Sequence, residues 1–171
     1  MTAAPADFVD LYRAELAYVV RTLRRLGVAE RDVEDVAHDV FLVVFRRRED
    51  RDPARPIRPW LFGIAYRVVG NHFQKAHRRR EVSDETPESA DGAPTPAEDA
   101  EQHERRRILL RALDDLDHEH RAVAILYEIE GLPAPVIAET LAIPVNTVYS
   151  RARSARQRLL EATRQLRGEK P

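Results

Sequence analysis

The residues with the clearest chemistry lie near the C-terminus, in the stretch VNTVYSRARSARQRL (residues 145–159). Between Arg151 and Arg158 this stretch holds four arginines and no acidic residue. Guanidinium groups, hydroxyls and amides are the groups that contact phosphates and base edges in the major groove of DNA. The stretch therefore indicates a helix that binds a polyanion, with duplex DNA as the first candidate.

A second cluster, DDLDHEH (residues 114–120), combines four carboxylates with two histidines. Side chains of these types at this density can ligate a metal ion, so a metal-dependent hydrolase is one interpretation. The stretch has no candidate nucleophile or phosphate-binding loop beside it, and acidic residues are also favoured near a helix N-terminus. The favoured interpretation is a polar junction between two helices. No catalytic residue, metal ion or cofactor is predicted.

The formal net charge of −1 conceals a strong charge pattern along the chain. Residues 46–80 carry a net charge of +8 and residues 143–171 a net charge of +5, whereas residues 81–104 between them carry −9. Basic blocks of this kind are the electrostatic footprint of a protein that binds a polyanion. Both basic blocks fall on segments that are predicted to be helical.

The first basic block interleaves cations with aromatic residues. Arg55 and Arg58 are expected to lie in a loop before Trp60, which itself is predicted to anchor the core. The aromatic residues of the helix that follows are Phe62, Tyr66 and Phe73. A basic groove with stacking surfaces for bases is what an opened DNA strand requires.

Apolar residues recur at helical spacing, and no stretch alternates apolar and polar residues as a strand would. The predicted fold class is all-α, with two small helical domains joined by a flexible acidic linker. Apolar stripes predict helices over residues 8–26, 33–44, 59–68, 108–116, 123–129, 135–141 and 145–162. Pro59 is predicted to occupy the first position of its helix.

The last two predicted helices are joined by three residues, as in a helix-turn-helix. At 100° per residue, the last helix directs one apolar stripe to the core: Val145, Val148, Ala152, Ala155, Leu159 and Ala162. The opposite side is predicted to carry Asn146, Thr147, Ser150, Ser154, Gln157 and Arg158, with Arg151 and Arg153 at its edges.

Residues 81–104 hold too few apolar side chains to offset the entropy of ordering them, which predicts a disordered acidic linker. This linker separates an N-terminal domain, residues 7–80, from a C-terminal domain, residues 105–165. No apolar run approaches the length of a membrane span, so no membrane insertion is expected. The N-terminus lacks the pattern of a signal peptide, and the expected location is cytoplasmic.

Three stretches together resemble the extracytoplasmic-function (ECF) family of RNA polymerase sigma factors. Residues 113–159 resemble region 4 of that family, and VEDVAHDVFLVVFRR (33–47) and RPWLFGIAYRVVGNHFQKAHRRR (58–80) resemble the two parts of region 2. The resemblance implies an alternative sigma factor that binds core RNA polymerase, recognises promoters and helps open the DNA, and that is not an enzyme. The implied partners are the largest and second-largest polymerase subunits, promoter DNA as duplex and single strand, and an anti-sigma factor.

The resemblance also implies which residues act in region 2. One face of the second helix would dock on the clamp helices of the largest polymerase subunit through Asp35, His38, Asp39, Leu42 and Phe45. The minus-ten element would be bound by Arg55, Arg58, Arg67, Asn71, Lys75, Arg78 and Arg79. The family usually has glutamine at His38, and often has asparagine at Arg67 and aspartate at Asn71.

The last helix resembles the reader of the minus-thirty-five element. The resemblance implies DNA contacts from Asn146, Thr147, Tyr149, Ser150, Arg151, Arg153 and Ser154. Glycine is common in the family at Ala142 and Asn146, a basic residue at Tyr149 and arginine at Ser154. The absence of a cation at Tyr149 and at Ser154, where the family commonly has one, implies a changed sequence preference, weaker phosphate contact, or both.

A stand-alone helix-turn-helix regulator that binds duplex DNA without polymerase is the alternative. Such a protein would need neither the docking face of the second helix nor the segment that mixes aromatic and basic residues. Specific duplex binding in the absence of polymerase would favour it.

Overall fold

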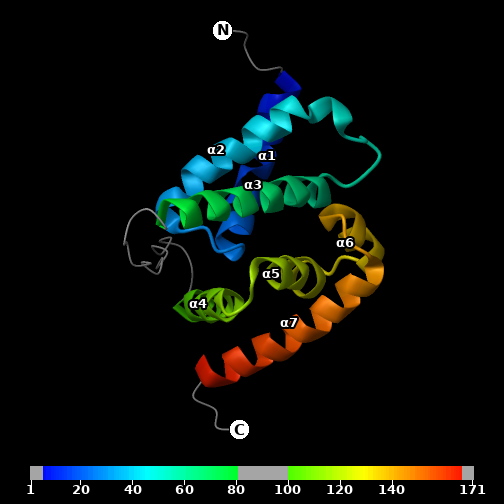
Figure 1. Cartoon of the computed structure of the whole chain (residues 1–171). Helices are drawn as coiled ribbons and strands as arrows, with labels where there is room; N and C mark the ends of the chain where they lie inside the picture. The colour runs from blue at the N-terminus through cyan, green and yellow to red at the C-terminus, as the bar shows by residue number, and fades with distance from the viewer. Residues whose placement is uncertain (1–5, 81–99, 167–171) are drawn as a thin grey trace. The chain divides into compact units, whose positions relative to one another are not determined.

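The computed structural model describes residues 6–80 and 100–166 (Figure 1). The all-α prediction is confirmed, because these two ranges contain helices and turns and no strand. The chain divides into two compact units, which hold α1 to α3 and α4 to α7 respectively. None of the described helices combines the length and apolar character needed to cross a membrane.

The helix bounds are as follows. The first unit contains α1 (Ala6–Arg25), α2 (Glu30–Arg46), the 3-10 turn η1 (Arg48–Asp50) and α3 (Ile57–Arg80). The second unit contains α4 (Ala100–Asp114), α5 (His118–Ala124), the π-helical turn η2 (Ile125–Ile129), α6 (Ala134–Leu141) and α7 (Val145–Leu166).

The core of the first unit is built around the apolar stripe of α2. All six residues of the predicted stripe are buried: Val33, Val36, Ala37, Val40, Phe41 and Val44. Buried residues of α1 and α3 complete this core, among them Tyr18, Val19, Leu23, Leu61, Phe62, Ile64, Ala65 and Val69. Burial of these side chains removes apolar surface from water and leaves only the opposite side of α2 for contact with a partner.

Two edge-to-face aromatic pairs hold α1 against α2. The ring centroids of Phe8 and Phe45 lie 5.0 Å apart, and those of Tyr12 and Phe41 lie 4.6 Å apart. Such pairs stabilise a helix interface beyond the burial of their area.

The start of α3 differs from the sequence-based prediction. The helix begins at Ile57, so Pro59 is its third residue rather than its first, and Arg58 lies in the helix rather than in a loop. Proline is tolerated there because the first four amides of a helix have no carbonyl partner within the helix. Phe62 is fully buried, so its prediction as one of the aromatics available to DNA was wrong.

The second unit has a core made largely of small and β-branched residues. Five consecutive residues from Ala122 to Leu126, at the end of α5 and the start of η2, are fully buried. α6 and α7 add Ile137, Leu141, Val148, Ala152, Ala155 and Ala162. The alanines of α7 allow the backbones of neighbouring helices to approach closely.

Three further predictions needed correction in this unit. α4 ends at Asp114, so Leu116 lies in the following turn, where its amide bonds to the carbonyl of Leu113 at 3.0 Å. α4 begins at Ala100, so residues 100–104 of the predicted linker are helical, consistent with the helix-forming residues there. The rest of the linker, residues 81–99, lies outside the described residues. Val145 is exposed at the start of α7 rather than part of the core stripe.

Candidate nucleic-acid interface and partner-binding face

The outer face of α2 presents the residues that were predicted to bind polymerase. Asp35, His38 and Asp39 are exposed on it, and the side chain of Leu42 is 40% exposed. Phe45 is half-buried, because its ring packs on Phe8 and the Arg48 guanidinium lies 4.6 Å from its centroid. The face therefore combines acidic side chains with an apolar patch, which suits a basic and partly apolar partner surface.

A groove between α2 and α3 joins the two predicted contact sets of the first unit. It has a volume of about 420 Å³. Asp39 and Leu42 line it from the α2 side, and Asn71 and Lys75 line it from the α3 side. The remaining lining residues are Val43, Arg46, Val68, His72 and Ala76. The structure thus brings part of the predicted polymerase face and part of the predicted minus-ten set to one surface.

His72 and Arg46 are groove residues that the sequence reasoning missed. His72 Nε2 lies 3.6 Å from the carboxylate of Asp32 at the start of α2. The positions 68, 71, 72, 75 and 76 recur at helical spacing, so one face of α3 was recognisable in the sequence. The position of this face of α3 opposite Arg46 depends on how α2 packs on α3, and helical periodicity does not predict that packing.

The two arginines before Trp60 have different surroundings. Arg58 Nε donates a hydrogen bond to Glu15 of α1 at 3.1 Å, and its guanidinium lies 5.1 Å from the centroid of the Tyr18 ring. Arg55 Nε lies 3.6 Å from the carboxylate of Asp52 in the same loop. Both side chains are more than half exposed. Arg58 is therefore positioned by α1, whereas Arg55 is held by a local contact.

The other predicted minus-ten residues lie along the exposed side of α3. Arg67 donates to the carbonyl of Gly63 at 3.2 Å, one turn earlier in the helix. Arg67, Asn71, Lys75 and Arg78 are all exposed. Arg79 is part of α3, but its side chain lies outside the described residues.

In the second unit, α7 follows α6 through a turn at Ala142. This residue adopts a left-handed conformation, with φ of 55° and ψ of 47°. Its amide bonds to the carbonyl of Glu139 at 3.3 Å, and the amide of Ile143 bonds to that of Ala138 at 3.0 Å. The helix-turn-helix geometry thus uses a backbone conformation that normally favours glycine, at a position where the resembled family commonly has it.

The exposed strip of α7 is rotated from the one that helical periodicity predicted. Asn146, Tyr149, Ser150, Arg153 and Gln157 are exposed, with Tyr149 53% exposed. Thr147 and Ser154 are half-buried. α7 packs against α4, α5 and α6, and the side of α7 that faces its neighbours includes Thr147 and Ser154 as well as the apolar stripe.

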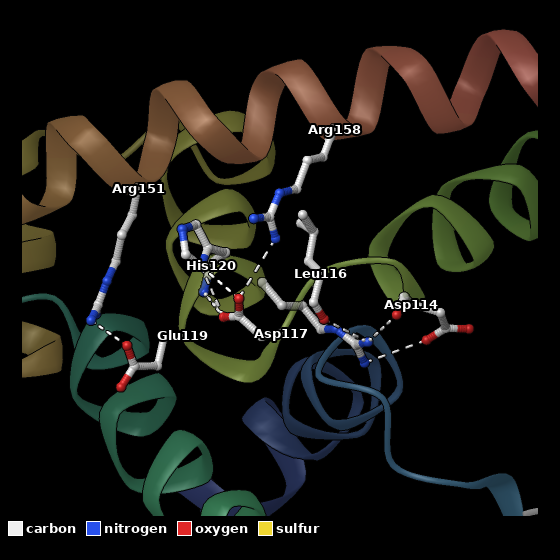
Figure 2. Close-up of polar contacts among 8 residues, drawn as sticks. Asp114, Leu116, Asp117, Glu119, His120, Arg151 and Arg158 are labelled. Atoms are coloured by element: carbon white, nitrogen blue, oxygen red, sulfur yellow. Dashed lines mark hydrogen bonds and ion pairs between the residues drawn. The ribbon is translucent and has the colours of Figure 1, made fainter.

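Three arginines of α7 form ion pairs within their own unit, two of which are seen in Figure 2. Arg151 pairs with Glu119 of α5, and Arg158 Nη1 lies 3.7 Å from the carboxylate of Asp117. Arg156 makes a two-pronged contact with Glu128 of η2, with N···O distances of 2.9 and 3.0 Å, and this bond raises the pKa of Arg156. Sequence reasoning singled out the cluster that holds Asp117 and Glu119 but missed Glu128 and all three pairings, because the acids precede their arginines by 28 to 41 positions.

Asp117 caps the N-terminus of α5. Its carboxylate accepts a hydrogen bond from the amide of His120 at 2.9 Å and lies 2.8 Å from the Nδ1 atom of the same residue (Figure 2). Burial alone would raise the pKa of Asp117, but the bonds from His120 and the charges of His120 and Arg158 bring the pKa below its ordinary value of 3.8.

The cluster of residues 114–120 is a helix junction, as the favoured interpretation held. Arg121 lies 3.4 Å from the carboxylate of Asp114 and donates to the carbonyls of Asp114 and Leu116, both at 3.1 Å. Asp117 caps α5, and Glu119 holds Arg151. Within residues 6–80 and 100–166, no group of three or more His, Asp or Glu side chains is arranged to hold a metal ion.

Comparison with known families gives two matches, one in each unit. The family described as sigma-70 region 2 matches residues 11–79, and the family described as sigma-70 region 4 matches residues 106–159. The two matched segments contain the α2 face with the groove, and the helix-turn-helix with most of α7.

Curated relatives match over most of the chain. It is 34% identical to the ECF RNA polymerase sigma factor SigE of Mycolicibacterium smegmatis, over 92% of this chain and 62% of SigE. It is 31% identical to the RNA polymerase sigma factor CnrH of Cupriavidus metallidurans, over 82% of this chain and 78% of CnrH. The chain therefore spans less than two thirds of the length of SigE and more than three quarters of the length of CnrH.

Two solved structures have a similar fold. The sigma factor RpoE of Bartonella quintana, solved in complex with the anti-sigma factor NepR, superposes with a TM-score of 0.77 at 21% identity, over 92% of this chain and 97% of RpoE. CnrH, solved in complex with the cytosolic domain of CnrY, superposes with a TM-score of 0.61 at 27% identity, over 90% of this chain and 85% of that chain.

Proposed function

The chain belongs to the ECF family of RNA polymerase sigma factors, and from this premise we propose that it binds core RNA polymerase, directs it to specific promoters and initiates DNA-dependent transcription. The observation that carries the proposal is that region 2 and region 4 follow each other along the chain and that each matches its own helical unit. The chain acts as an initiation factor in this role and performs no catalysis itself.

Core polymerase is bound by the outer face of α2. The contact residues are Asp35, His38, Asp39, Leu42 and Phe45. This assignment is supported by the exposure of Asp35, His38, Asp39 and Leu42, which place acidic groups beside an apolar patch. An interface of this composition gains specificity from its charges and affinity from its apolar centre.

The opened minus-ten strand is bound by α3 and the loop before it, through Arg55, Arg58, Arg67, Asn71, Lys75, Arg78 and Arg79. Cations along the exposed side of α3 neutralise phosphates, and half-buried Tyr66 and Phe73 provide ring surface for stacking. The groove lined by Asn71 and Lys75 continues to Asp39 and Leu42, so strand capture takes place next to the polymerase contact.

The minus-thirty-five element is bound as duplex by α7. Asn146, Thr147, Tyr149, Ser150, Arg151, Arg153 and Ser154 are the candidate contacts. Exposure favours Asn146, Tyr149, Ser150 and Arg153 among them, whereas Arg151 is less exposed and pairs with Glu119. The tyrosine provides a ring and a hydroxyl where the family commonly has a cation, which alters the bases that the helix reads.

The domain division follows the same roles. Residues 7–80 form region 2 and residues 105–165 form region 4, and residues 81–104 join them, with residues 100–104 belonging to the start of α4. The protein works in the cytoplasm with polymerase, and an anti-sigma factor regulates it. Sigma factors of this fold have been solved with protein partners, RpoE with the anti-sigma factor NepR and CnrH with the cytosolic domain of CnrY.

Binding to core polymerase is the direct test. Full-length protein labelled with a fluorophore is titrated with bacterial core polymerase, and the Asp39→Arg variant is compared with Asp10→Arg, which changes an exposed acid of α1 by the same charge. We expect tight binding of the wild type and of Asp10→Arg, and at least tenfold weaker binding of Asp39→Arg. Specific duplex binding without any affinity for core polymerase would instead identify a stand-alone regulator.

A further inference from the structure

The exposed strip of α7 has arginines along both edges, and acids of the same unit hold those arginines. At 100° per residue, Arg153 lies near the centre of the strip, Arg151 and Arg158 lie along one edge and Arg156 lies along the other. Arg153 is exposed and has no ion-pair partner among the described residues, in contrast to the three arginines at the edges.

The acids come from the two elements beside α7. Glu119 and Asp117 at the start of α5 hold the edge that carries Arg151 and Arg158 (Figure 2). Glu128 of η2 holds Arg156 on the other edge through both of its carboxylate oxygens, at 2.9 and 3.0 Å. Two-pronged contacts of this kind are the strongest form of the arginine–carboxylate pair.

The packing of the unit keeps these pairs in place. Val148, Ala152 and Ala155 are buried, and they are small enough to bring α7 close to its neighbours. Asp117 is fixed by the amide and ring of His120, so its carboxylate does not move freely. Each of the Arg151–Glu119 and Arg156–Glu128 pairs has one partner that is largely shielded from solvent, since the Arg151 side chain is 20% exposed and that of Glu128 24%.

An arginine that stays with its carboxylate neutralises no DNA phosphate. The salt dependence of DNA binding counts the cations that replace condensed counterions on the duplex, with a slope of about −0.9 per phosphate contact. The paired arginines therefore add little to nonspecific attraction, although they contribute most of the positive charge near the strip.

We propose that Glu119, Asp117 and Glu128 are positioning residues that serve as built-in counterions of α7. They neutralise the arginines at the edges, so that contact with DNA depends on Arg153 and the polar side chains of the strip. Nonspecific binding to phosphate is thereby kept low, and discrimination between DNA sequences is improved. The proposal rests on the proposed role of α7 as the promoter-binding helix.

The test measures how salt affects binding of the full-length protein to a fluorescein-labelled duplex that contains no promoter. Fluorescence anisotropy gives the affinity between about 50 and 200 mM salt. In Glu119→Gln, Arg151 becomes free for phosphate, so the slope should steepen by about 0.9, equivalent to roughly threefold more loss of affinity across that range. Glu128→Gln should act in the same way through Arg156, and the double variant should show the sum.

Two controls separate this effect from a change of net charge. In an Arg151→Ala background, Glu119→Gln should leave the slope unchanged, because no arginine is released. Asp115→Asn removes one exposed acid of the same unit whose charge acts on Arg121 rather than on α7, and its slope should match the wild type. Exposed ion pairs contribute little to stability, so the variants are expected to fold, which circular dichroism checks.

Several results would overturn the inference. These are an unchanged or shallower slope in both Glu119→Gln and Glu128→Gln, an equal increase in Asp115→Asn, or a persistent effect of Glu119→Gln in the Arg151→Ala background. Transcription with core polymerase is measured on the same preparations. Initiation by the wild type with an unchanged slope in the variants contradicts the counterion role alone, whereas absence of initiation contradicts the proposed function.

Discussion

Asp117 illustrates how a single carboxylate serves two elements at once. It caps α5 through the amide of His120, contacts the ring of the same residue and lies near Arg158 of α7. An acidic residue was expected near this helix start on general grounds, because its charge favours the positive end of the helix dipole. Its link to α7 depends on tertiary packing.

The lowered pKa of Asp117 predicts a dependence of stability on pH. Because the folded-state pKa lies below 3.8, the ionised group stabilises the fold above that value, and this contribution is lost as the pH falls through the folded-state pKa. Asp117→Asn retains a good capping residue but cannot titrate. Urea unfolding from about pH 5 to about pH 2.5 should show a smaller loss of stability in the variant than in the wild type. Equal losses in both proteins would contradict this assignment.

Ala142 gives a second prediction at the scale of one residue. A left-handed conformation is unfavourable for alanine and unstrained for glycine. Ala142→Gly should therefore raise the free energy of unfolding by about 1 kcal/mol and the melting temperature by roughly 4–8 °C. The matched control is Ala138→Gly in the middle of α6, which should destabilise the protein by about 1 kcal/mol. A loss of stability in Ala142→Gly would show that the turn does not strain the alanine.

At the scale of the element, α3 has one face for the core and one for ligands. Phe62 is fully buried, whereas Arg67 is exposed one to two turns later. Phe62→Ala should lower the free energy of unfolding by about 3–5 kcal/mol, because it leaves a cavity. Arg67→Ala should leave stability nearly unchanged and weaken binding of a single-stranded minus-ten oligonucleotide by the holoenzyme. Chemical unfolding and fluorescence titration measure the two effects. A stable Phe62→Ala variant that fails only in strand binding would contradict the burial of this ring.

The buried side of a helix could be predicted where the spacing of its own apolar residues determines that side. The α2 stripe was predicted in full because six apolar residues at helical spacing leave one choice for the buried face. The strip of α7 was predicted with a rotation, because the half-burial of Thr147 and Ser154 depends on how many helices cover α7. The π-helical turn η2 and the pairing of Glu128 with Arg156 have no local sequence signal.

At the scale of the whole molecule, charge is balanced locally as well as along the chain. The sequence pattern assigned most of the charge opposing the C-terminal arginines to residues 81–104, with a net charge of −9. The second unit also contains its own opposing charges, since Glu119, Asp117 and Glu128 pair with Arg151, Arg158 and Arg156. A near-neutral protein can therefore present separate polyanion-binding surfaces with little attraction to DNA in general.

The central claim is that this chain gives RNA polymerase its promoter specificity. The most direct measurement adds the purified full-length protein to bacterial core polymerase on a pooled genomic template and maps the 5′ ends of the transcripts by sequencing. We predict discrete new start sites that share two upstream motifs at a fixed spacing and that disappear when the protein is omitted. An active core polymerase that binds the protein and yet starts at the same positions with and without it would contradict the account.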